Sequence, residues 1–135
     1  MTPNWGTAEA GVHQGISVAD FDGDGDLDFV VNKLNRPARL YRNDSPAPRI
    51  AVRLRGRTPN RAAVGAKVRV RCAGLPEQRA DVSVGGRYLS GFDSALTFAA
   101  GKTEQAAQAL VIWPGGKETT VILKANHAYE IEELQ

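Results

Sequence analysis

The sequence predicts an all-β protein of 135 residues, with a β-hairpin near its amino terminus followed by an antiparallel β-sandwich. Short apolar runs alternate with polar residues along most of the chain, which is the period of half-buried strands. Glycine and proline separate these runs at short intervals, as in sandwiches and barrels. Only residues 103–108 have a helix-like composition, and this segment is too short to form a stable helix alone.

The first two strands are expected at residues 15–19 and 27–32, on either side of an acidic loop. Gly25, at the sixth loop position, permits the sharp turn that oxygen-ligand calcium loops need. Two like charges about 4 Å apart repel by roughly 4 kcal/mol at an effective dielectric near 20, so the loop either stays open to water or binds a cation. Five aspartates occupy every second position of the loop: Asp20, Asp22, Asp24, Asp26 and Asp28.

These five aspartates are the predicted metal ligands, and their hard oxygen donors favour Ca²⁺. We expect carboxylate oxygens from the first three, a backbone carbonyl from the fourth and a closing ligand from the fifth. The loop is not an EF-hand, because its twelfth position is Val31 where that motif has a glutamate. The alternative is a solvated acidic turn.

Apolar residues of the hairpin alternate with the aspartates and are expected on the opposite face, where they would anchor the loop to the core. A turn is predicted at residues 34–37, followed by a third strand at residues 38–42 with Leu40 pointing inward. The expected anchoring residues are Phe21, Leu27, Phe29 and Val31.

The pattern D-x-D-G-D-G-D-x-D between two β runs, followed by residues 38–44, resembles an FG-GAP or VCBS repeat over about residues 11–44. The resemblance implies one blade of an integrin-like β-propeller, with calcium bound by Asp20, Asp22, Asp24, Asp26 and Asp28. Propellers need about four to eight blades, and this sequence contains one copy.

A boundary is predicted at residues 46–48, because Pro46 and Pro48 cannot join a ladder interior and stiffen an extended link. The expected domains are a hairpin blade at residues 1–45 and a β-sandwich at residues 49–135. Its predicted strands are residues 50–55, 64–72, 81–85, 95–98, 109–113, 119–123 and 129–133.

Two local features of the sandwich can be predicted further. Pro114 and Gly115 indicate a hairpin turn, with Gly115 at positive φ. Cys72 continues the apolar phase of its strand, which indicates a buried and inert thiol. As the single cysteine, it excludes an intrachain disulfide.

The second part also resembles a known family, the ASPIC/UnbV domain, over about residues 49–134. The resemblance is carried by residues 60–68, 86–90, 96–98 and 111–116, although residues 98–101 read Phe-Ala-Ala-Gly where that family usually has Phe-Gly-Leu-Gly. This domain typically follows FG-GAP/VCBS repeats, as in the cartilage acidic protein family and many bacterial secreted proteins. The resemblance therefore implies an extracytoplasmic home, although residues 1–6 do not resemble a secretory signal.

Charge and motifs narrow the function classes. The net charge is +2, with an excess of bases over residues 35–79. These arginines alternate with apolar residues and have little aromatic interleaving, which disfavours nucleic acid. No transmembrane run, nucleophile elbow, phosphate loop or Cys/His metal spacing occurs. Ser90, Asp93 and His127 could be imagined as a triad, but no spacing places them together.

The sequence thus predicts a non-enzymatic calcium-binding module with a structural, adhesion or protein-interaction role, as the carboxy-terminal part of a larger extracytoplasmic protein. Self-association through the unpaired hairpin edge is one expected mode of contact. The alternative is a carbohydrate-binding sandwich with a structural calcium site, in which Trp113 would be the most exposed ring of a platform. That platform would comprise Tyr88, Phe92, Trp113 and Tyr129.

Overall fold

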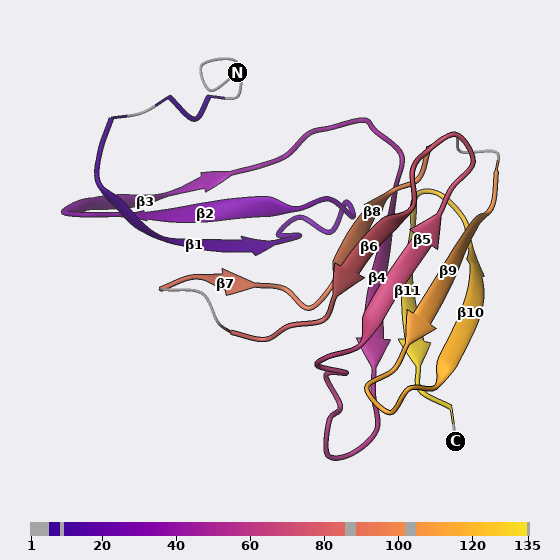
Figure 1. Cartoon of the computed structure of the whole chain (residues 1–135). Helices are drawn as coiled ribbons and strands as arrows, with labels where there is room; N and C mark the ends of the chain where they lie inside the picture. The colour runs from indigo at the N-terminus through magenta and orange to yellow at the C-terminus, as the bar shows by residue number, and fades with distance from the viewer. Residues whose placement is uncertain (1–5, 9, 86–88, 102–104, 135) are drawn as a thin grey trace.

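The computed structural model describes residues 6–8, 10–85, 89–101 and 105–134, and within these ranges it contains strands and no helix. A four-stranded sheet, here called the first sheet, lies to one side of two further sheets (Figure 1). Its strand order is β3 (Arg36–Tyr41), β2 (Asp28–Lys33), β1 (His13–Ala19) and β7 (Gly91–Phe92).

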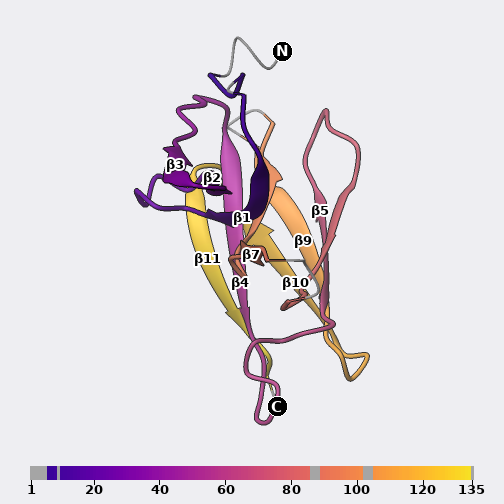
Figure 2. The ribbon, with the colours of Figure 1, turned by 90° about the vertical axis from the view of Figure 1, so that its left-hand side faces the viewer.

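The other two sheets face each other and form the sandwich (Figure 2). One has the order β10 (Glu118–Leu123), β9 (Ala107–Ile112), β5 (Lys67–Arg71) and β6 (Gln78–Asp81). The other has the order β11 (His127–Glu132), β4 (Arg49–Arg55) and β8 (Leu96–Ala99). The predicted all-β class and sandwich are confirmed, with one difference: β11 pairs with β4 in parallel.

The core lies between the two sandwich sheets. Ile50 and Val52 from β4 and Val68 and Val70 from β5 are fully buried, whereas Arg53 and Lys67 point outward. This is the period-two alternation that the sequence predicts for these strands. Each such buried aliphatic side chain contributes about 1.5–3 kcal/mol of transfer free energy.

The β9–β10 hairpin closes through a three-residue turn. The Gly116 amide donates to the Trp113 carbonyl at 2.8 Å, and the Trp113 amide donates to the Lys117 carbonyl at 2.9 Å. Positive φ falls on Gly116, at +84°, and not on Gly115 as predicted. The arrangement is that of a type I turn followed by a left-handed residue, which adds one residue to the expected turn.

Several strand boundaries differ from the predictions. The strand predicted at 81–85 lies earlier, at β6, while Val82 is buried beyond its end and donates its amide to Ala66. Strand β7 is two residues long and was not predicted. In the helix-like run at 103–108, residues 103–104 lie outside the described ranges and the last two residues begin β9.

The expected inward position of Leu40 is wrong, since its side chain is 62% exposed. Strand β3 is an edge strand, and its register places Leu40 beside Val30 on one face and Tyr41 beside Phe29 on the other. No third layer covers β3 within the described residues, so alternation alone could not identify a buried side.

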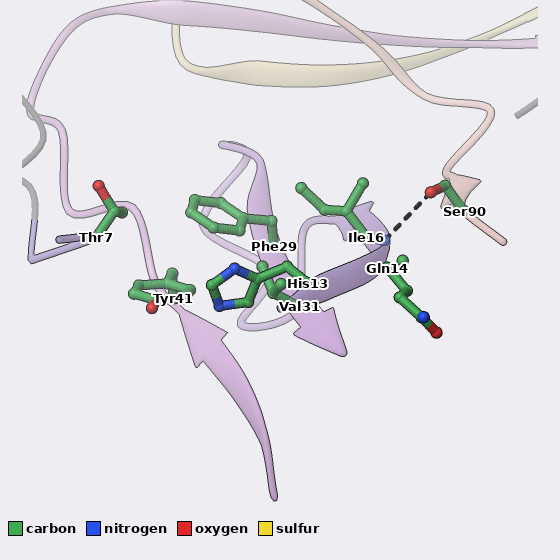
Figure 3. A pocket seen from close by; sticks show the side chains of 9 residues that line it. Thr7, His13, Gln14, Ile16, Phe29, Val31, Tyr41 and Ser90 are labelled. Carbon is green, nitrogen blue, oxygen red and sulfur yellow. Dashed lines mark hydrogen bonds between the residues drawn. The ribbon is translucent and has the colours of Figure 1, made fainter. Parts of the chain in front are cut away.

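The first sheet has an open cavity of about 380 Å³ on the face that carries Phe29 and Tyr41 (Figure 3). The two rings stack with their centroids 4.8 Å apart. Ile16 and Val31 lie in register on the same face. Strand β7 pairs with β1 in parallel, so a segment of the second half of the chain completes the sheet begun by the first half. The predicted domain division at residues 46–48 remains a prediction.

Candidate metal site in the β1–β2 loop

The loop between β1 and β2 folds around the side chain of Asp20. Its two carboxylate oxygens accept hydrogen bonds from the amides of Gly23 at 2.7 Å and Gly25 at 2.9 Å. Both glycines have positive φ, at +78° and +90°, a conformation in which a side chain is strained. The glycine positions therefore permit the turn that directs the loop amides toward one carboxylate.

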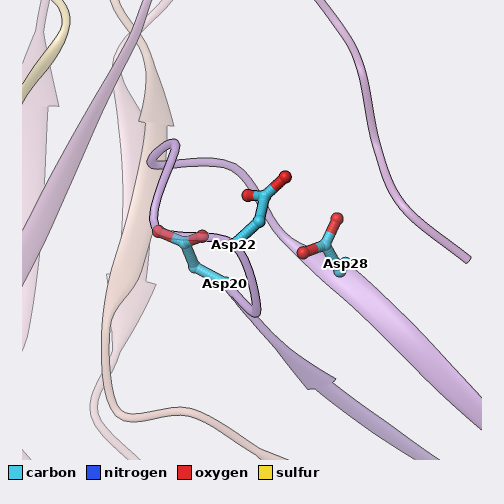
Figure 4. A group of neighbouring side chains, drawn as sticks. All are labelled: Asp20, Asp22 and Asp28. Carbon is cyan, nitrogen blue, oxygen red and sulfur yellow. The ribbon is translucent and has the colours of Figure 1, made fainter. Parts of the chain in front are cut away.

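Three of the five predicted ligands converge. Asp20, Asp22 and Asp28 each offer a carboxylate oxygen, and these oxygens all lie within 4.8 Å of one another (Figure 4). Asp28 is 1% exposed and accepts from the amides of Phe21 at 2.9 Å and Asn43 at 2.8 Å. One member of the group is therefore a buried carboxyl group whose orientation is fixed by two backbone amides.

The other two aspartates face Arg49, the first residue of β4. The Arg49 guanidinium forms an ion pair with Oδ2 of Asp26, and its Nη2 lies 4.0 Å from Oδ2 of Asp24. Asp26 is 3% exposed, and its ion pair lacks hydrogen-bond geometry. Its Oδ1 has no hydrogen-bond partner in the described part of the chain.

Arg49 is thus a site residue that sequence reasoning missed. It follows the acidic loop by more than twenty positions, and its place in an alternating strand marks it only as outward-facing. One sequence signal could have pointed to Arg49: it directly follows the Pro-rich link, so the start of its strand lies close to the hairpin that the link leaves.

The expected apolar anchoring of the loop is wrong in part. Phe21 is 51% exposed, and Leu27, Phe29 and Val31 are only partly buried. The deeply buried loop side chain is Asp26, with Asp28 at the start of β2. The loop is therefore held by polar contacts, because its buried side chains are charged and must find partners.

The residues present fit a hard divalent cation. The convergent donors are carboxylate oxygens alone, and a buried oxygen of Asp26 lacks a hydrogen-bond donor. Oxygen-only donor sets suit calcium. Whether all five aspartates bind such an ion stays a prediction.

The other sites considered from sequence are not assembled. Trp113, expected to be exposed, is 2% exposed, and its indole Nε1 donates to Thr119 at 2.8 Å. The predicted exposure is wrong because the hairpin turn folds the ring onto the sandwich core. Phe92 lies in the first sheet, Tyr129 is partly buried, and Tyr88 lies outside the described residues. The proposed ring platform thus loses the side chain on which it depended.

Members of the imagined triad contact different groups. Ser90 Oγ accepts from the Ile16 amide at 3.2 Å, Asp93 pairs with Arg53, and His127 Nδ1 lies 2.8 Å from the Ala125 carbonyl. These contacts assign each residue a structural partner and give no nucleophile–base pair.

Cys72 is buried as predicted, at 7% exposure, and its thiol donates to the Ala99 carbonyl at 3.4 Å. Burial raises the pKa of the Cys72 thiol, because it disfavours the thiolate. At neutral pH the sulfur is therefore a protonated core group and a poor nucleophile.

The fold and the loop define an all-β module in which an acidic loop lies against a two-sheet sandwich. The family model described as ASPIC and UnbV matches residues 56–135, more than half of the chain. The chain belongs to this family. The match begins after β4, so strands β1–β3 and the acidic loop lie outside it, while β7 of the first sheet lies within it. A search of curated proteins finds no match to the chain. No helix capable of crossing a membrane occurs within the described residues.

Proposed function

We propose that this chain is a non-enzymatic calcium-binding β module with a structural or protein-interaction role in a larger extracytoplasmic protein. The observation that carries the proposal is the convergence of carboxylate oxygens from Asp20, Asp22 and Asp28 within 4.8 Å. Three anions so close together are mutually repulsive unless a cation lies among them.

Calcium would supply charge neutralisation at this site. The chain's own residues supply the geometry: the Gly23 and Gly25 amides orient the Asp20 carboxylate, and the Asn43 amide orients that of Asp28. Carboxylates held ionised by a cation are poor proton donors, which supports a structural role for the loop.

We further propose that the first sheet is a blade of the FG-GAP/VCBS type within a larger assembly. Apolar side chains lie on both of its faces, with Val18 and Phe29 in register on one and Val30 beside Leu40 on the other. Leu40 is 62% exposed, and the two Phe29-face residues are only partly buried. A sheet with two apolar faces favours a position between neighbouring layers.

Calcium binding is tested by thermal unfolding of the full chain in calcium and in chelator. We expect a higher Tm in calcium, because an ion that binds only the folded state adds about 2.7 kcal/mol at a hundredfold excess over its Kd. Asp20→Ala removes a convergent carboxylate and should abolish the shift.

Asp44→Ala is the matched control. Asp44 is an exposed aspartate that pairs with Arg42 at 2.7 Å and lies outside the convergent group, so the shift should persist. Superimposable melting curves for the parent chain in the two buffers would refute calcium binding.

A further inference from the structure

Strand β4 has different functions on its two faces. Ile50 and Val52 point into the sandwich core and are fully buried, each with 0% of its surface exposed. Arg49, Ala51 and Arg53 alternate with them and point toward the first sheet. The small side chain of Ala51 lines a cavity together with loop residues and with Asp93, which follows β7.

Two arginines of this face, Arg49 and Arg53, hold two separate parts of the first sheet. Arg49 pairs with Asp26 in the loop and donates from Nη2 to the Ser45 carbonyl at 2.7 Å. Arg53 contacts both carboxylate oxygens of Asp93, at 3.0 and 2.9 Å, just after β7. The Asp93 amide in turn donates to the Val18 carbonyl in β1 at 2.9 Å.

Only the Arg49 contact involves the acidic loop. In the sequence, Asp26 directly follows Gly25 and precedes Asp28 by two positions. The Gly25 amide donates a hydrogen bond to the Asp20 carboxylate. The Arg49–Asp26 ion pair therefore joins β4 to the loop segment that folds around Asp20. Opening of the loop by repulsion among its carboxylates would remove Asp26 from its buried position and break the ion pair.

We propose that Arg49 is a positioning residue that couples occupation of the loop by a divalent cation to the stability of the sandwich. The inference rests on the proposed calcium binding and adds that the effect of the ion passes through the Arg49–Asp26 pair into β4. Coupling of this kind is reciprocal, so a folded sandwich also favours the closed loop and tighter calcium binding.

The experiment uses Trp113 as a reporter, because it is buried in the sandwich core, far along the chain from the loop. The second tryptophan of the sequence, Trp5, is replaced by phenylalanine in the full chain, so that Trp113 is the one tryptophan that fluoresces. This Trp5→Phe chain is the background for all variants. Urea unfolding is followed by Trp113 fluorescence in calcium and in chelator, and calcium binding is measured separately by calorimetry.

We expect calcium to raise the urea midpoint reported by Trp113. In Arg49→Gln this rise should be lost, while calorimetry still detects calcium, because the convergent carboxylates are intact. The matched control is Arg55→Gln, on the same strand and face, whose partners are the exposed Glu130 and Glu132. The control should keep the full rise.

Asp26→Asn provides a second variant if Arg49→Gln unfolds, since it removes the partner charge at constant size. The rise should be lost while calorimetry still detects calcium, which separates the coupling from a ligand role of Asp26. A full rise in either variant would overturn the coupling. If calorimetry detects calcium binding to the background chain but the urea midpoint reported by Trp113 does not rise, the coupling is overturned and calcium binding stands. Absence of calcium heat in the background chain would overturn both.

Discussion

The sandwich and the first sheet are built from strands of similar length but bury different chemistry. In the sandwich the buried side chains are apolar, such as Val68, Val111 and Leu123, each fully inaccessible. In the segment that forms β1–β3 and their connections, the buried side chains are Asp26, Asp28 and Lys33. Strand alternation therefore predicts where side chains point without predicting how a sheet is stabilised.

The difference has an energetic consequence. Apolar burial contributes about 25 cal/mol per Å² without needing a particular partner. Burial of a charge costs several kcal/mol unless a partner is present. Apolar burial thus stabilises the sandwich core, whereas the buried acidic side chains beside the first sheet require polar partners such as Arg49 and, under the proposal above, a cation.

The largest expected effect comes from removing an aromatic ring from each region. Trp113→Ala should cost about 3–5 kcal/mol of unfolding free energy, because it empties a filled core position. Phe29→Ala should cost roughly half as much, because its ring is only partly buried. Urea unfolding measures both.

Ile122→Ala is the control, because it shortens a side chain of the sandwich that is 61% exposed and therefore lies outside the core. It should stay within about 0.5 kcal/mol of the parent chain. Equal losses for the two aromatic variants would mean that the first sheet buries its rings as well as the sandwich does.

The joint between the two regions can be tested at Gly15. A Cβ added there would lie 2.3 Å from the Leu89 carbonyl oxygen, so the backbone leading to β7 must move. Gly15→Ala should cost about 1–3 kcal/mol and speed amide exchange at Asp93, whose N–H donates to Val18 of β1.

Gly91→Ala is the matched variant on the other side of the same strand pair. Its added Cβ would meet only Ser17 Oγ, at 3.4 Å, which is ordinary contact. Unchanged Asp93 exchange in Gly15→Ala would show that the pairing of β7 with β1 absorbs the added methyl group, and would contradict the prediction.

Much of the fold could be predicted because local pattern determined it. Alternation identified β4 and β5, and the Pro-Gly sequence identified the β9–β10 turn. Strand β7 could not be predicted, because two residues carry no period and the pairing depends on contact with β1, more than seventy positions earlier. Leu40 was misplaced because a period of two does not say which face another layer covers.

The site shows the same limit. The acidic loop was visible as five aspartates, and three of them converge. Asp24 and Asp26 lie toward Arg49 instead, a residue that tertiary folding brings to the loop. Trp113 was misplaced because proximity to a turn indicates exposure, while the ring folds back over the hairpin to reach Thr119.

The smallest expected effect concerns an ion-pair group on the outer side of the sandwich. Hydrogen bonds from Arg71 and then Arg79 lower the pKa of Glu77. A lowered folded-state pKa contributes stability above the unfolded pKa, near 4.3, and this stability is lost as pH falls through the folded value. Glu77→Gln should therefore flatten the acid limb of a plot of urea midpoint against pH.

The control is Glu118→Gln in β10 of the same sheet, which removes an exposed carboxylate and leaves the contacts of Glu77 with Arg71 and Arg79 in place. Because Arg71 and Arg79 are largely exposed, at 72% and 67%, added salt should shrink the difference between the two variants. The buried Arg49–Asp26 pair should respond less to salt, since solvent ions cannot approach it closely. If salt did not change the contribution of Glu77 to the urea midpoint, its ion pairs would not be screened by solvent ions. The exposed pairs of the sandwich and the buried Arg49–Asp26 pair would then not differ in their response to salt.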